Sequence, residues 1–300
     1  MRILVTGSSG LIGRALRAFL AAEGHDVVCL TRSAARAGDG YIRWDPEGGI
    51  LPTEQLEDFD GVVHLAGETI VGRWTAQKKA RILNSRINST RLLCESLAHV
   101  RDRPFVLVAA SAIGYYGDRG DQLLDESSSA GSLFLSEVAQ AWEAATEPAK
   151  RSGIRVVNLR IGFVLSAAGG GLAALLLPFK LGMGGRVGSG LQYLSWIAID
   201  DVLGAISHAM VRDQLRGAVN AVAPHPVTNR EFTDTLGRVL GRPTVFPLPS
   251  FAAHMVMGEM ADNLLLASTR VLPGRLLATG YEFKFPQLRA ALRHVLGKDG

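Results

Sequence analysis

Cysteine is almost missing from this sequence, since only Cys29 and Cys94 occur among its 300 residues. Two cysteines cannot form a disulfide framework, so we expect reduced thiols and a cytoplasmic protein. No apolar run reaches the length of about 18 residues that a membrane-spanning helix needs. The first predicted strand begins directly after Met1, which leaves no room for a secretory signal. These absences predict a protein with no membrane partner.

Clustered charge of one sign is missing as well. The 32 basic and 28 acidic residues give a formal net charge of +4 and an isoelectric point near 9.3, but the cations are scattered along the chain. A nucleic-acid-binding protein gathers its cations on one face, so we expect no nucleic-acid partner. We also predict no metal site. Hydrophobic residues form 47% of the chain, enough for a large buried core. The length fits one α/β domain with an appendage.

The chain opens on a strand, a glycine-rich turn, a helix and a second strand. Residues 2–5 form a short apolar run with β-branched members, and residues 26–30 form another. Between them, residues 14–23 carry apolar side chains at helical spacing. The turn after the first strand holds three glycines: Gly7, Gly10 and Gly13.

Each of these glycines has a physical role in a dinucleotide site. Gly7 permits the tight turn, Gly10 lets the backbone approach a pyrophosphate, and Gly13 lets the helix pack closely on the sheet. The free N–H groups at the start of the helix attract phosphates. The alternative is a glycine-rich turn that only packs two elements together. The predicted phosphate-binding residues are Gly7, Ser9, Gly10, Leu11, Ile12 and Gly13.

The end of the second strand indicates which dinucleotide is bound. An acidic residue there would bind a ribose 2′-hydroxyl, whereas an arginine accommodates a 2′-phosphate. The chain has Thr31 and Arg32 at this point, Arg36 one turn later, and no acid between Leu30 and Gly38. We therefore predict that Thr31 and Arg32 bind NADP rather than NAD. The alternative is that Arg32 is a solvated loop cation.

Strands and helices alternate through the first two thirds of the chain. Further strands are predicted within residues 41–45, 59–67, 105–111, 154–159 and 218–223, and helices over residues 78–99, 134–150, 172–181 and 200–212. This alternation predicts an α/β fold with a doubly wound parallel sheet of the Rossmann type. We expect an NADP-binding Rossmann domain over residues 1–224, with residues 166–195 reaching toward a smaller C-terminal lobe. That lobe, over residues 225–300, would lie on the substrate side.

Three more places along the chain are candidates for cofactor contact. Asp45 either accepts a hydrogen bond from an adenine amino group or only organises its turn. The sequence Leu65-Ala66-Gly67 follows a buried strand, where a ligand crosses the carboxyl edge of a parallel sheet. Arg81 and Arg86 lie on the predicted helix over residues 78–99. They either contact an NADP phosphate or an anionic substrate, or they are solvated helix cations.

Polar side chains follow the predicted strand over residues 105–111. Ser111 could hydrogen-bond a substrate carbonyl, and Tyr115 or Tyr116 could donate a proton, so these three are the candidate catalytic residues. The alternative is that Ser111 caps a turn and the tyrosines line a pocket passively. Arg160, at the end of a later strand, needs an anionic partner if it is buried. That partner is either a substrate or an internal acid.

Several motifs together resemble the extended short-chain dehydrogenase/reductase superfamily: Gly7-Ser8-Ser9-Gly10-Leu11-Ile12-Gly13, His64-Leu65-Ala66-Gly67 and Ser111-Ala112-Ile113-Gly114-Tyr115-Tyr116-Gly117. The chain more narrowly resembles the atypical NAD-dependent epimerase-like subfamily with an added C-terminal domain of unknown function. That resemblance rests on Gly67-Glu68, Arg73-Trp74, Ser85-Arg86, Gly188-Ser189-Gly190-Leu191-Gln192, Ser195-Trp196-Ile197, Leu272-Pro273 and Ala278-Thr279-Gly280-Tyr281. It covers essentially the whole chain and implies an NADP-binding Rossmann domain.

The chain departs from this superfamily at the catalytic pair. Extended reductases resemble one another in a Tyr-x-x-x-Lys pair, in which the Tyr exchanges a proton with the substrate and the Lys lowers the pKa of the Tyr. If Glu143 aligns with the Glu that commonly follows this Lys by four residues, the two positions hold Leu135 and Ala139. Neither side chain can move a proton.

Two functions follow from these observations. The first is an NADP-dependent oxidoreductase or epimerase that acts on a small or nucleotide-activated substrate and uses a non-standard acid. The second is an NADPH-binding sensor or regulatory protein without turnover. The missing Tyr and Lys favour the second, whereas the substrate lobe and the glycine-rich residues 182–190 favour the first. A small-molecule partner is expected in either case, and the sequence leaves the oligomeric state undetermined.

Overall fold

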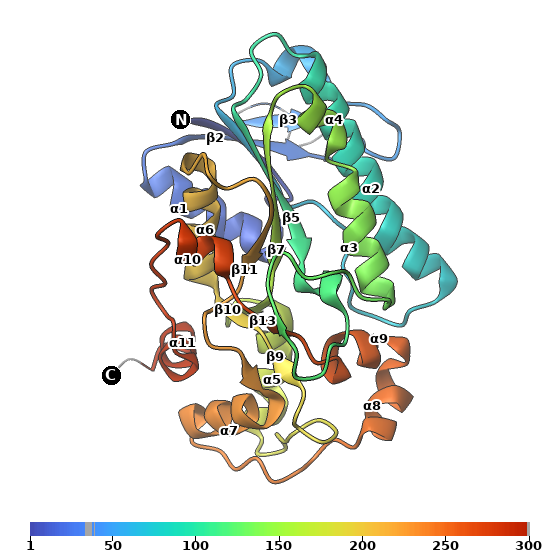
Figure 1. Ribbon diagram of the computed structural model, residues 1–300, viewed down its shortest axis with the longest axis vertical. Helices are drawn as coiled ribbons and strands as arrows, with labels where there is room; N and C mark the ends of the chain where they lie inside the picture. Colours follow the sequence, from blue (N-terminus) through green and yellow to red (C-terminus); the bar gives the residue numbers. More distant parts are fainter. Residues whose placement is uncertain (34–37, 39, 299–300) are drawn as a thin grey trace.

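A seven-stranded sheet forms the centre of the computed structural model, which describes residues 1–33, 38 and 40–298 (Figure 1). Arg36 lies outside the described residues. Every neighbouring pair of strands in this sheet is parallel, in the order β11-β7-β5-β4-β1-β2-β3. The strands are β1 (Arg2–Thr6), β2 (Asp26–Thr31), β3 (Tyr41–Arg43), β4 (Gly61–His64), β5 (Val106–Ala112), β7 (Arg155–Ile161) and β11 (Gly217–Ala221).

The order of the strands reverses between β1 and β4, which confirms the predicted doubly wound α/β fold. From β1 the chain proceeds outward through β2 to β3, and it then returns to the other side of β1 to form β4, β5, β7 and β11. Ligands of such sheets bind outside the carboxyl ends of the strands, at this switch point. The glycine-rich turn follows β1 directly and therefore lies at that edge.

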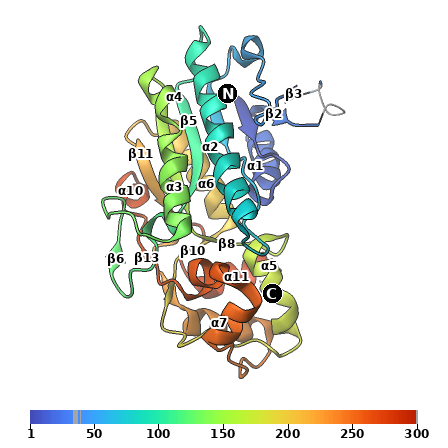
Figure 2. The same ribbon diagram turned by 90° about the vertical axis from the view of Figure 1, so that its right-hand side faces the viewer.

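Helices cover both faces of the sheet (Figures 1 and 2). One face carries α1 (Leu11–Ala22) and α6 (Ile199–Val211), and the other carries α2 (Ala76–His99), α3 (Phe134–Ala144) and α4 (Glu147–Arg151). Successive residues of β1 point to opposite faces, so Ile3 and Val5 join one buried core and Leu4 joins the other. Apolar burial on both faces explains why the strands read as continuous hydrophobic runs.

The predicted single helix over residues 134–150 is wrong, because the chain forms two helices there. α3 ends at Ala144, and α4 begins at Glu147 with Pro148 in its first turn. Proline has no N–H group, and its ring clashes with the carbonyl group four residues earlier, so α3 cannot continue through this position. The first turn of a new helix tolerates proline.

The C-terminal lobe lies below the sheet in Figure 1 and combines segments from both sides of residue 224. Its core unites Leu172 and Phe179 of α5 (Gly170–Lys180) with Phe232 of α7 (Asn229–Leu240) and Leu292 of α11 (Leu288–Val295), so the packing crosses the predicted boundary. Three strand pairs complete it: β8 (Phe163–Leu165) with β10 (Trp196–Ala198), β9 (Tyr193–Leu194) with β12 (Val227–Thr228), and β6 (Leu123–Leu124) with β13 (Arg270–Val271). Its other helices are α8 (Ser250–Met257) and α9 (Glu259–Ala261), whereas α10 (Gly274–Ala278) packs against β11 of the Rossmann sheet (Figure 1).

The last part of the chain is tied back to the Rossmann sheet by a buried carboxylate. Asp201 of α6 accepts hydrogen bonds from the Tyr281 hydroxyl and from the backbone N–H groups of Lys284 and Phe285. Burial raises the pKa of Asp201 in spite of these donors. The motif around Tyr281 therefore has a structural role in this protein.

Across the described residues, no helix has the length and apolar character to cross a membrane.

Candidate functional site

The turn after β1 and the start of α1 contain two glycines, Gly7 and Gly13, at which there is no space for a side chain. Gly7 has a φ of +68°, and a Cβ atom there would lie 2.6 Å from the carbonyl carbon of Leu65. At Gly13 a Cβ atom would lie only 2.2 Å from the Gly7 oxygen, so this glycine lets α1 approach the turn. Gly10 differs, since the one atom within 4 Å of its added Cβ is that same oxygen at 3.3 Å. Space is therefore open in front of Gly10, as backbone approach to a phosphate requires.

The start of α1 offers unshared N–H groups at the carboxyl edge of the sheet. Gly10 is the N-cap residue of α1, and no side chain caps it. The first N–H groups of a helix have no partners within the helix, and the helix dipole adds partial positive charge there. The backbone of Leu11, Ile12 and Gly13 is therefore placed to attract a phosphate.

A cavity of about 570 Å³ opens at this edge between the glycine turn, the ends of β2 and β4, and α2. Most of the predicted cofactor residues line it, namely Gly7, Ser9, Gly10, Thr31, Arg32, Leu65, Ala66, Gly67 and Arg81. Sequence reasoning missed the polar wall that α2 contributes, formed by Gln77, Asn84, Ser85, Asn88 and Ser89. The spacing of Gln77, Arg81, Asn84 and Asn88, which recur every three to four residues along one helix face, is the signal that could have found it.

Two arginines and a carboxylate line this cavity. Glu68 accepts a 2.7 Å hydrogen bond from Lys78 at its Oε1 atom. This hydrogen bond holds the pKa of Glu68 below its usual range, and the charges of Arg81 and Arg32 lower it further. Arg32 follows the end of β2, and Arg81 belongs to α2. Two cations from separate elements therefore line the same cavity.

Five predicted cofactor residues lie outside the cavity lining: Leu11, Ile12 and Gly13 at the start of α1, and also Asp45 and Arg86. Arg86 is largely buried, where it donates 3.0 Å hydrogen bonds to the carbonyl oxygens of Glu68 and Ile82 and stacks on Trp142. Burial lowers the pKa of Arg86 to about 10. Asp45 accepts hydrogen bonds of 3.1 Å from the N–H groups of residues 47 and 48. Arg86 therefore supports the loop after β4, and the Asp45 carboxylate organises its own turn.

A buried histidine fixes the floor of the cavity. The Thr6 hydroxyl oxygen accepts the backbone N–H groups of Leu65 and Ala66 at 3.1 and 3.2 Å. Because both lone pairs of this oxygen are used, the Thr6 hydroxyl donates its proton to His64 Nδ1 at 2.7 Å. The ring proton of His64 is therefore on Nε2, which lies 2.9 Å from the Thr90 hydroxyl oxygen. Burial lowers the pKa of His64 to about 3. This neutral imidazole links β1, β4 and α2 beneath the cofactor-binding edge.

The candidate catalytic serine belongs to a buried ionic network. Ser111, at the end of β5, donates a 2.7 Å hydrogen bond to Glu143 Oε1 on α3. Arg160 of β7 holds both oxygens of the same carboxylate, with distances of 2.7 and 2.8 Å from its Nε and Nη2 atoms. The sequence predicts that a buried Arg160 pairs with either a substrate or an internal acid, and in the structure it pairs with an internal acid, Glu143.

The two candidate tyrosines have different surroundings. Tyr116 is fully buried, donates to Asn220 Oδ1 at 2.7 Å and accepts from Arg160 Nη1 at 3.0 Å. Burial raises the pKa of Tyr116, in spite of the opposing charge of Arg160. Tyr115 is half-buried, and its ring centroid lies 3.4 Å from the Arg160 guanidinium carbon. Of the two, only Tyr115 retains access to solvent.

Leu135 and Ala139, at which the resemblance would place the Tyr and the Lys, are part of the packing of α3. A Cβ atom on Gly114 would lie 3.2 Å from the Cβ atom of Leu135, and Ala139 is buried. The N–H group of Leu135 donates to Asn263 Oδ1 at 3.1 Å, so the C-terminal lobe supplies the cap that α3 lacks at its start. Lys79 of α2 pairs with Glu259 of α9 at 2.8 Å beside this contact.

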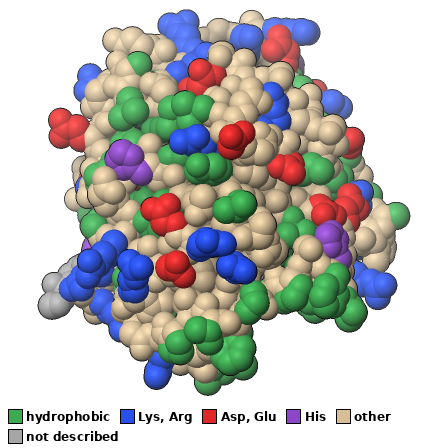
Figure 3. Space-filling model, turned by 60° about the horizontal axis from the view of Figure 1, so that its bottom comes forward, with side chains coloured by type: hydrophobic (Ala, Val, Ile, Leu, Met, Phe, Trp, Pro, Cys, Tyr) green, Lys and Arg blue, Asp and Glu red, His purple; other side chains and the backbone are tan. Residues whose placement is uncertain are grey.

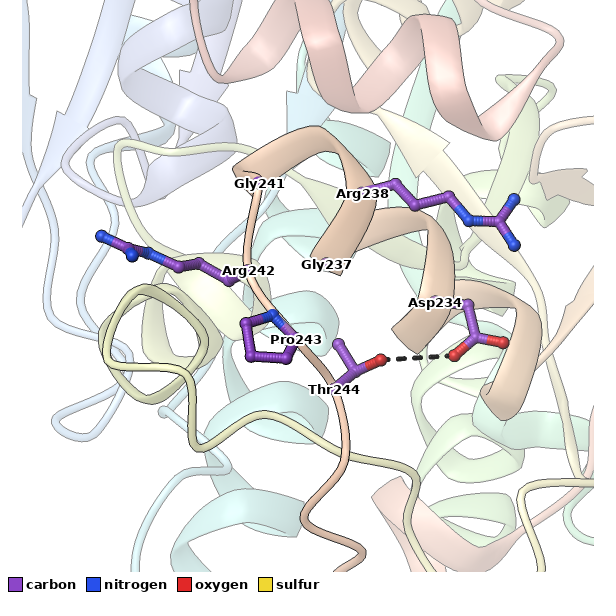
Figure 4. A pocket seen from close by; sticks show the side chains of 7 residues that line it. All are labelled: Asp234, Gly237, Arg238, Gly241, Arg242, Pro243 and Thr244. Carbon is purple, nitrogen blue, oxygen red and sulfur yellow. Dashed lines mark hydrogen bonds between the residues drawn. The ribbon is translucent and has the colours of Figure 1, made fainter.

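A second hollow, of about 480 Å³, lies over α7 (Figure 4). Its lining contains Asp234, which accepts a 3.4 Å hydrogen bond from the Thr244 hydroxyl. The side chains of Arg238 and Arg242 point away from each other (Figure 4). The hollow therefore presents no convergent set of charges.

Comparison with known proteins gives a consistent result over the whole chain. The family model described as "NAD dependent epimerase/dehydratase family" matches residues 3–221, and the one described as "Domain of unknown function (DUF1731)" matches residues 248–295. The chain is 42% identical over 299 residues to the epimerase family protein Mb2239 of Mycobacterium bovis, covering 99% of this chain and 98% of that protein.

Two solved structures are similar as well. The structure of human epimerase family protein SDR39U1 with NADPH superposes with a TM-score of 0.90 at 38% identity and covers 99% of each chain. The nucleoside-diphosphate sugar epimerase of Corynebacterium glutamicum superposes with a TM-score of 0.82 at 36% identity, over 99% of this chain and 58% of that one.

Proposed function

The chain belongs to the NAD dependent epimerase/dehydratase family, and from that premise we propose that it binds NADP(H) at the carboxyl edge of its sheet as an SDR-like oxidoreductase or epimerase. The observation that carries this proposal is the pair Arg32 and Arg81, which line the same cavity from two separate elements. A 2′-phosphate is the cofactor group that such a pair of guanidinium groups would bind. The human relative solved with NADPH supports this choice.

The residues of the glycine turn fit the pyrophosphate of this cofactor. Gly10 leaves space that a side chain would fill, and the uncapped start of α1 supplies N–H donors. Asn84 and Asn88 add amide donors and acceptors on the opposite wall of the cavity. When bound, the nicotinamide supplies or accepts a hydride.

The chemistry of this chain differs from a Tyr-Lys proton relay. Leu135 and Ala139 cannot exchange protons, and the Ser111 proton is directed to Glu143. Ser111 therefore has only lone pairs to offer, so it would accept a hydrogen bond from a hydroxyl or amide group and would not donate one to a carbonyl. Tyr115 is the remaining candidate acid, and the Arg160 guanidinium stacks on its ring face.

The proposed substrate is a small or nucleotide-activated molecule bound between the sheet edge and the C-terminal lobe. The lobe approaches this edge through Asn263 and Glu259 of the α9 region. The Corynebacterium glutamicum relative, a nucleoside-diphosphate sugar epimerase, supports a nucleotide-activated substrate. The buried free thiols Cys29 and Cys94 support a reducing, cytoplasmic compartment.

A second candidate function is an NADPH-binding sensor without turnover. The observation that favours it is the burial of the reactive groups, since Tyr116 is fully buried and the hydroxyl of Ser111 is engaged by Glu143. A protein that kept the cofactor site but lost proton transfer would have this arrangement.

Two readouts together separate the two functions. The protein is incubated with a panel of small carbonyl compounds and NADPH, followed by nicotinamide absorbance, and with nucleotide sugars and NADP⁺, followed by NMR of the sugar, while binding of NADPH is followed by its fluorescence. We expect binding in every case and, with at least one class of substrate, either a decrease in absorbance, as an oxidoreductase requires, or an epimerised sugar without net oxidation of the cofactor, as an epimerase requires. Binding with neither change over the whole panel would favour the sensor, and absence of NADPH binding would contradict both functions.

A further inference from the structure

Two long segments of the C-terminal lobe contain no acidic residue. Residues 163–199 and 235–258 have no Asp or Glu, although acids and bases are nearly balanced over the whole chain. The basic residues within these segments are Lys180, Arg186, Arg238 and Arg242. The net charge of +4 for the whole chain does not reveal this local excess of basic residues.

The fold brings the two segments together. Leu248 donates a 2.8 Å backbone hydrogen bond to the Arg186 oxygen, and Gly188 donates one of 2.9 Å to the Leu248 oxygen. Phe246 and Gly184 form a longer contact of 3.4 Å between the same backbones. The second segment also contains α8, which begins two residues after Leu248. We refer to residues 177–191 and 242–257 together as the acid-free surface.

This surface carries most of the large hydrophobic side chains that the protein exposes. Among the described residues, sixteen such side chains are exposed, and ten of them belong to the acid-free surface. Phe251, Met255 and Val256 of α8 are 69%, 80% and 82% exposed. The others are Leu177, Leu181, Met183, Leu191, Val245, Phe246 and Leu248. Figure 3 shows hydrophobic side chains gathered in two areas along the lower edge of that view.

The cations of the surface form no ion pair with an acid that the structure describes. Within the described part of the chain, Lys180, Arg186 and Arg242 of the surface and Arg238 beside it have no ion pair. Of the neighbouring carboxylates, Asp262 pairs with His254 at 2.7 Å and Glu259 with Lys79 at 2.8 Å. Asp234 accepts a 3.4 Å hydrogen bond from the Thr244 hydroxyl and lines a hollow with Arg238 and Arg242, so these cations outnumber it.

From this combination we infer that the acid-free surface binds peripherally to an anionic lipid bilayer. Exposed Phe, Met and Leu side chains enter the boundary between headgroups and acyl chains, and nearby Lys and Arg are attracted to anionic headgroups. Such binding needs no membrane-spanning helix, so the expectation of no membrane partner, which rested on the lack of a long apolar run, does not bear on it.

The positive charge of the acid-free surface disfavours two other binding partners, a second copy of this chain and a helix of another protein. A symmetric contact between two copies of this chain would bring the same unpaired cations together, which is unfavourable. A protein helix would need an apolar groove, but the hollow beside the surface is lined by Asp234, Arg238, Arg242 and Thr244 (Figure 4). A flat anionic surface matches both the protruding apolar side chains and the cations.

Flotation of the full chain with lipid vesicles tests this inference. Vesicles of phosphatidylcholine are compared with vesicles of phosphatidylcholine and phosphatidylserine, each at low and high salt. Two double variants are used, Phe251→Ser with Met255→Ser and Lys180→Glu with Arg242→Glu. The matched controls, Val211→Ser and Arg212→Glu, change exposed residues outside the surface. NADPH affinity and circular dichroism report on the fold of each variant.

We expect the parent protein and the controls to float with the anionic vesicles at low salt only, since salt screens the cations. Each double variant should lose affinity by on the order of tenfold or more, while its NADPH affinity stays at the parental value. Absence of binding to anionic vesicles, equal binding to neutral ones, or parental binding by both double variants would overturn the inference. A dimer that both double variants dissociate, without vesicle binding, would assign the surface to a second copy instead.

Discussion

The Ser111 hydroxyl donates a hydrogen bond of 2.7 Å to the carboxylate of Glu143. Arg160 donates hydrogen bonds to both oxygens of that carboxylate, so both oxygens act as acceptors in this network. The direction of the bond is therefore fixed, and Ser111 presents lone pairs to the sheet edge. This differs from the expectation that Ser111 would hydrogen-bond a substrate carbonyl, because a carbonyl oxygen needs a donor.

Replacing Glu143 with Ala should destabilise the protein strongly. The Arg160 side chain is only 4% exposed, and it would lose its counter-ion. Removing one partner of a buried ion pair costs about 3–5 kcal/mol of unfolding free energy. Chemical denaturation measures this loss. As a control, Glu147→Ala removes the exposed i,i+4 partner of Arg151 and should cost less than about 1 kcal/mol. Similar losses for both variants would refute a structural role of the Glu143–Arg160 pair.

The two tyrosines should separate into a structural and a chemical residue. Tyr116→Phe leaves Asn220 Oδ1 and Arg160 Nη1 without their buried partner, which should cost about 1–3 kcal/mol of unfolding free energy. Tyr115→Phe should leave stability nearly unchanged. If a substrate is turned over, we expect Tyr115→Phe to lower kcat by about 10²–10⁴-fold without changing the affinity for NADPH. Parental turnover by Tyr115→Phe would remove that residue from the catalytic list.

Acid should destabilise the fold through His64. Its pKa is about 3 in the folded protein and about 6.5 in an unfolded chain. Below pH 6.5 the unfolded chain therefore gains a proton that the folded protein does not take up until about pH 3, so stability is lost as the pH falls through this window. The slope approaches about 1.4 kcal/mol per pH unit.

His64→Gln provides the comparison, because glutamine does not titrate. Denaturation curves between pH 7 and pH 4 should show a steeper loss for the parent protein than for this variant. Parallel curves would show that His64 is protonated in the folded protein and that its neutral hydrogen-bond arrangement is incorrect.

Gly10 and Gly13 should respond differently to an added side chain. Gly10→Val should keep the fold, since a single backbone atom lies within 4 Å of its added Cβ, but it should abolish NADPH binding by blocking the pyrophosphate. Gly13→Ala places a Cβ atom 2.2 Å from the Gly7 oxygen, so it should destabilise the fold by about 1–3 kcal/mol or more. Thermal unfolding and NADPH titration check both. Retained NADPH affinity in Gly10→Val would mean that the glycine turn only packs two elements together.

The parallel sheet and the glycine turn could be predicted because their signals are local. Each buried strand reads as a continuous apolar run, and Gly13 is required by contacts within one strand–turn–helix unit. Gly7 adopts a positive φ in the same turn, although the atoms that a Cβ would meet there belong to Leu65 and Ala66 after β4. Pro148 could have revealed the break between α3 and α4, but the helical spacing of the apolar residues on both sides of the break suggested one continuous helix. The position of Arg32 at the end of β2 followed from the same unit.

The rest of the site depends on contacts between distant parts of the chain. Glu143, Arg160 and Asn220 come from three separate elements and meet only in the folded protein. His64 and Thr6 are 58 residues apart, and no local pattern marks them as partners. Asn263, which caps α3 from the C-terminal lobe, lies 128 residues from Leu135. Packing between these elements decides which polar side chains remain accessible. The spacing of residues along the sequence contains no information about this accessibility.

The central claim is that NADP(H) binds with its 2′-phosphate against Arg32. Calorimetric titration of NADPH and of NADH into the parent protein and Arg32→Ala tests it, with Arg43→Ala as a control because Arg43 is exposed but does not line the cavity. We predict tighter binding of NADPH than of NADH by the parent protein. Arg32→Ala should lose about 1–3 kcal/mol of NADPH binding free energy and leave NADH binding nearly unchanged. Equal losses for both cofactors, or a parent protein that prefers NADH, would contradict the claim.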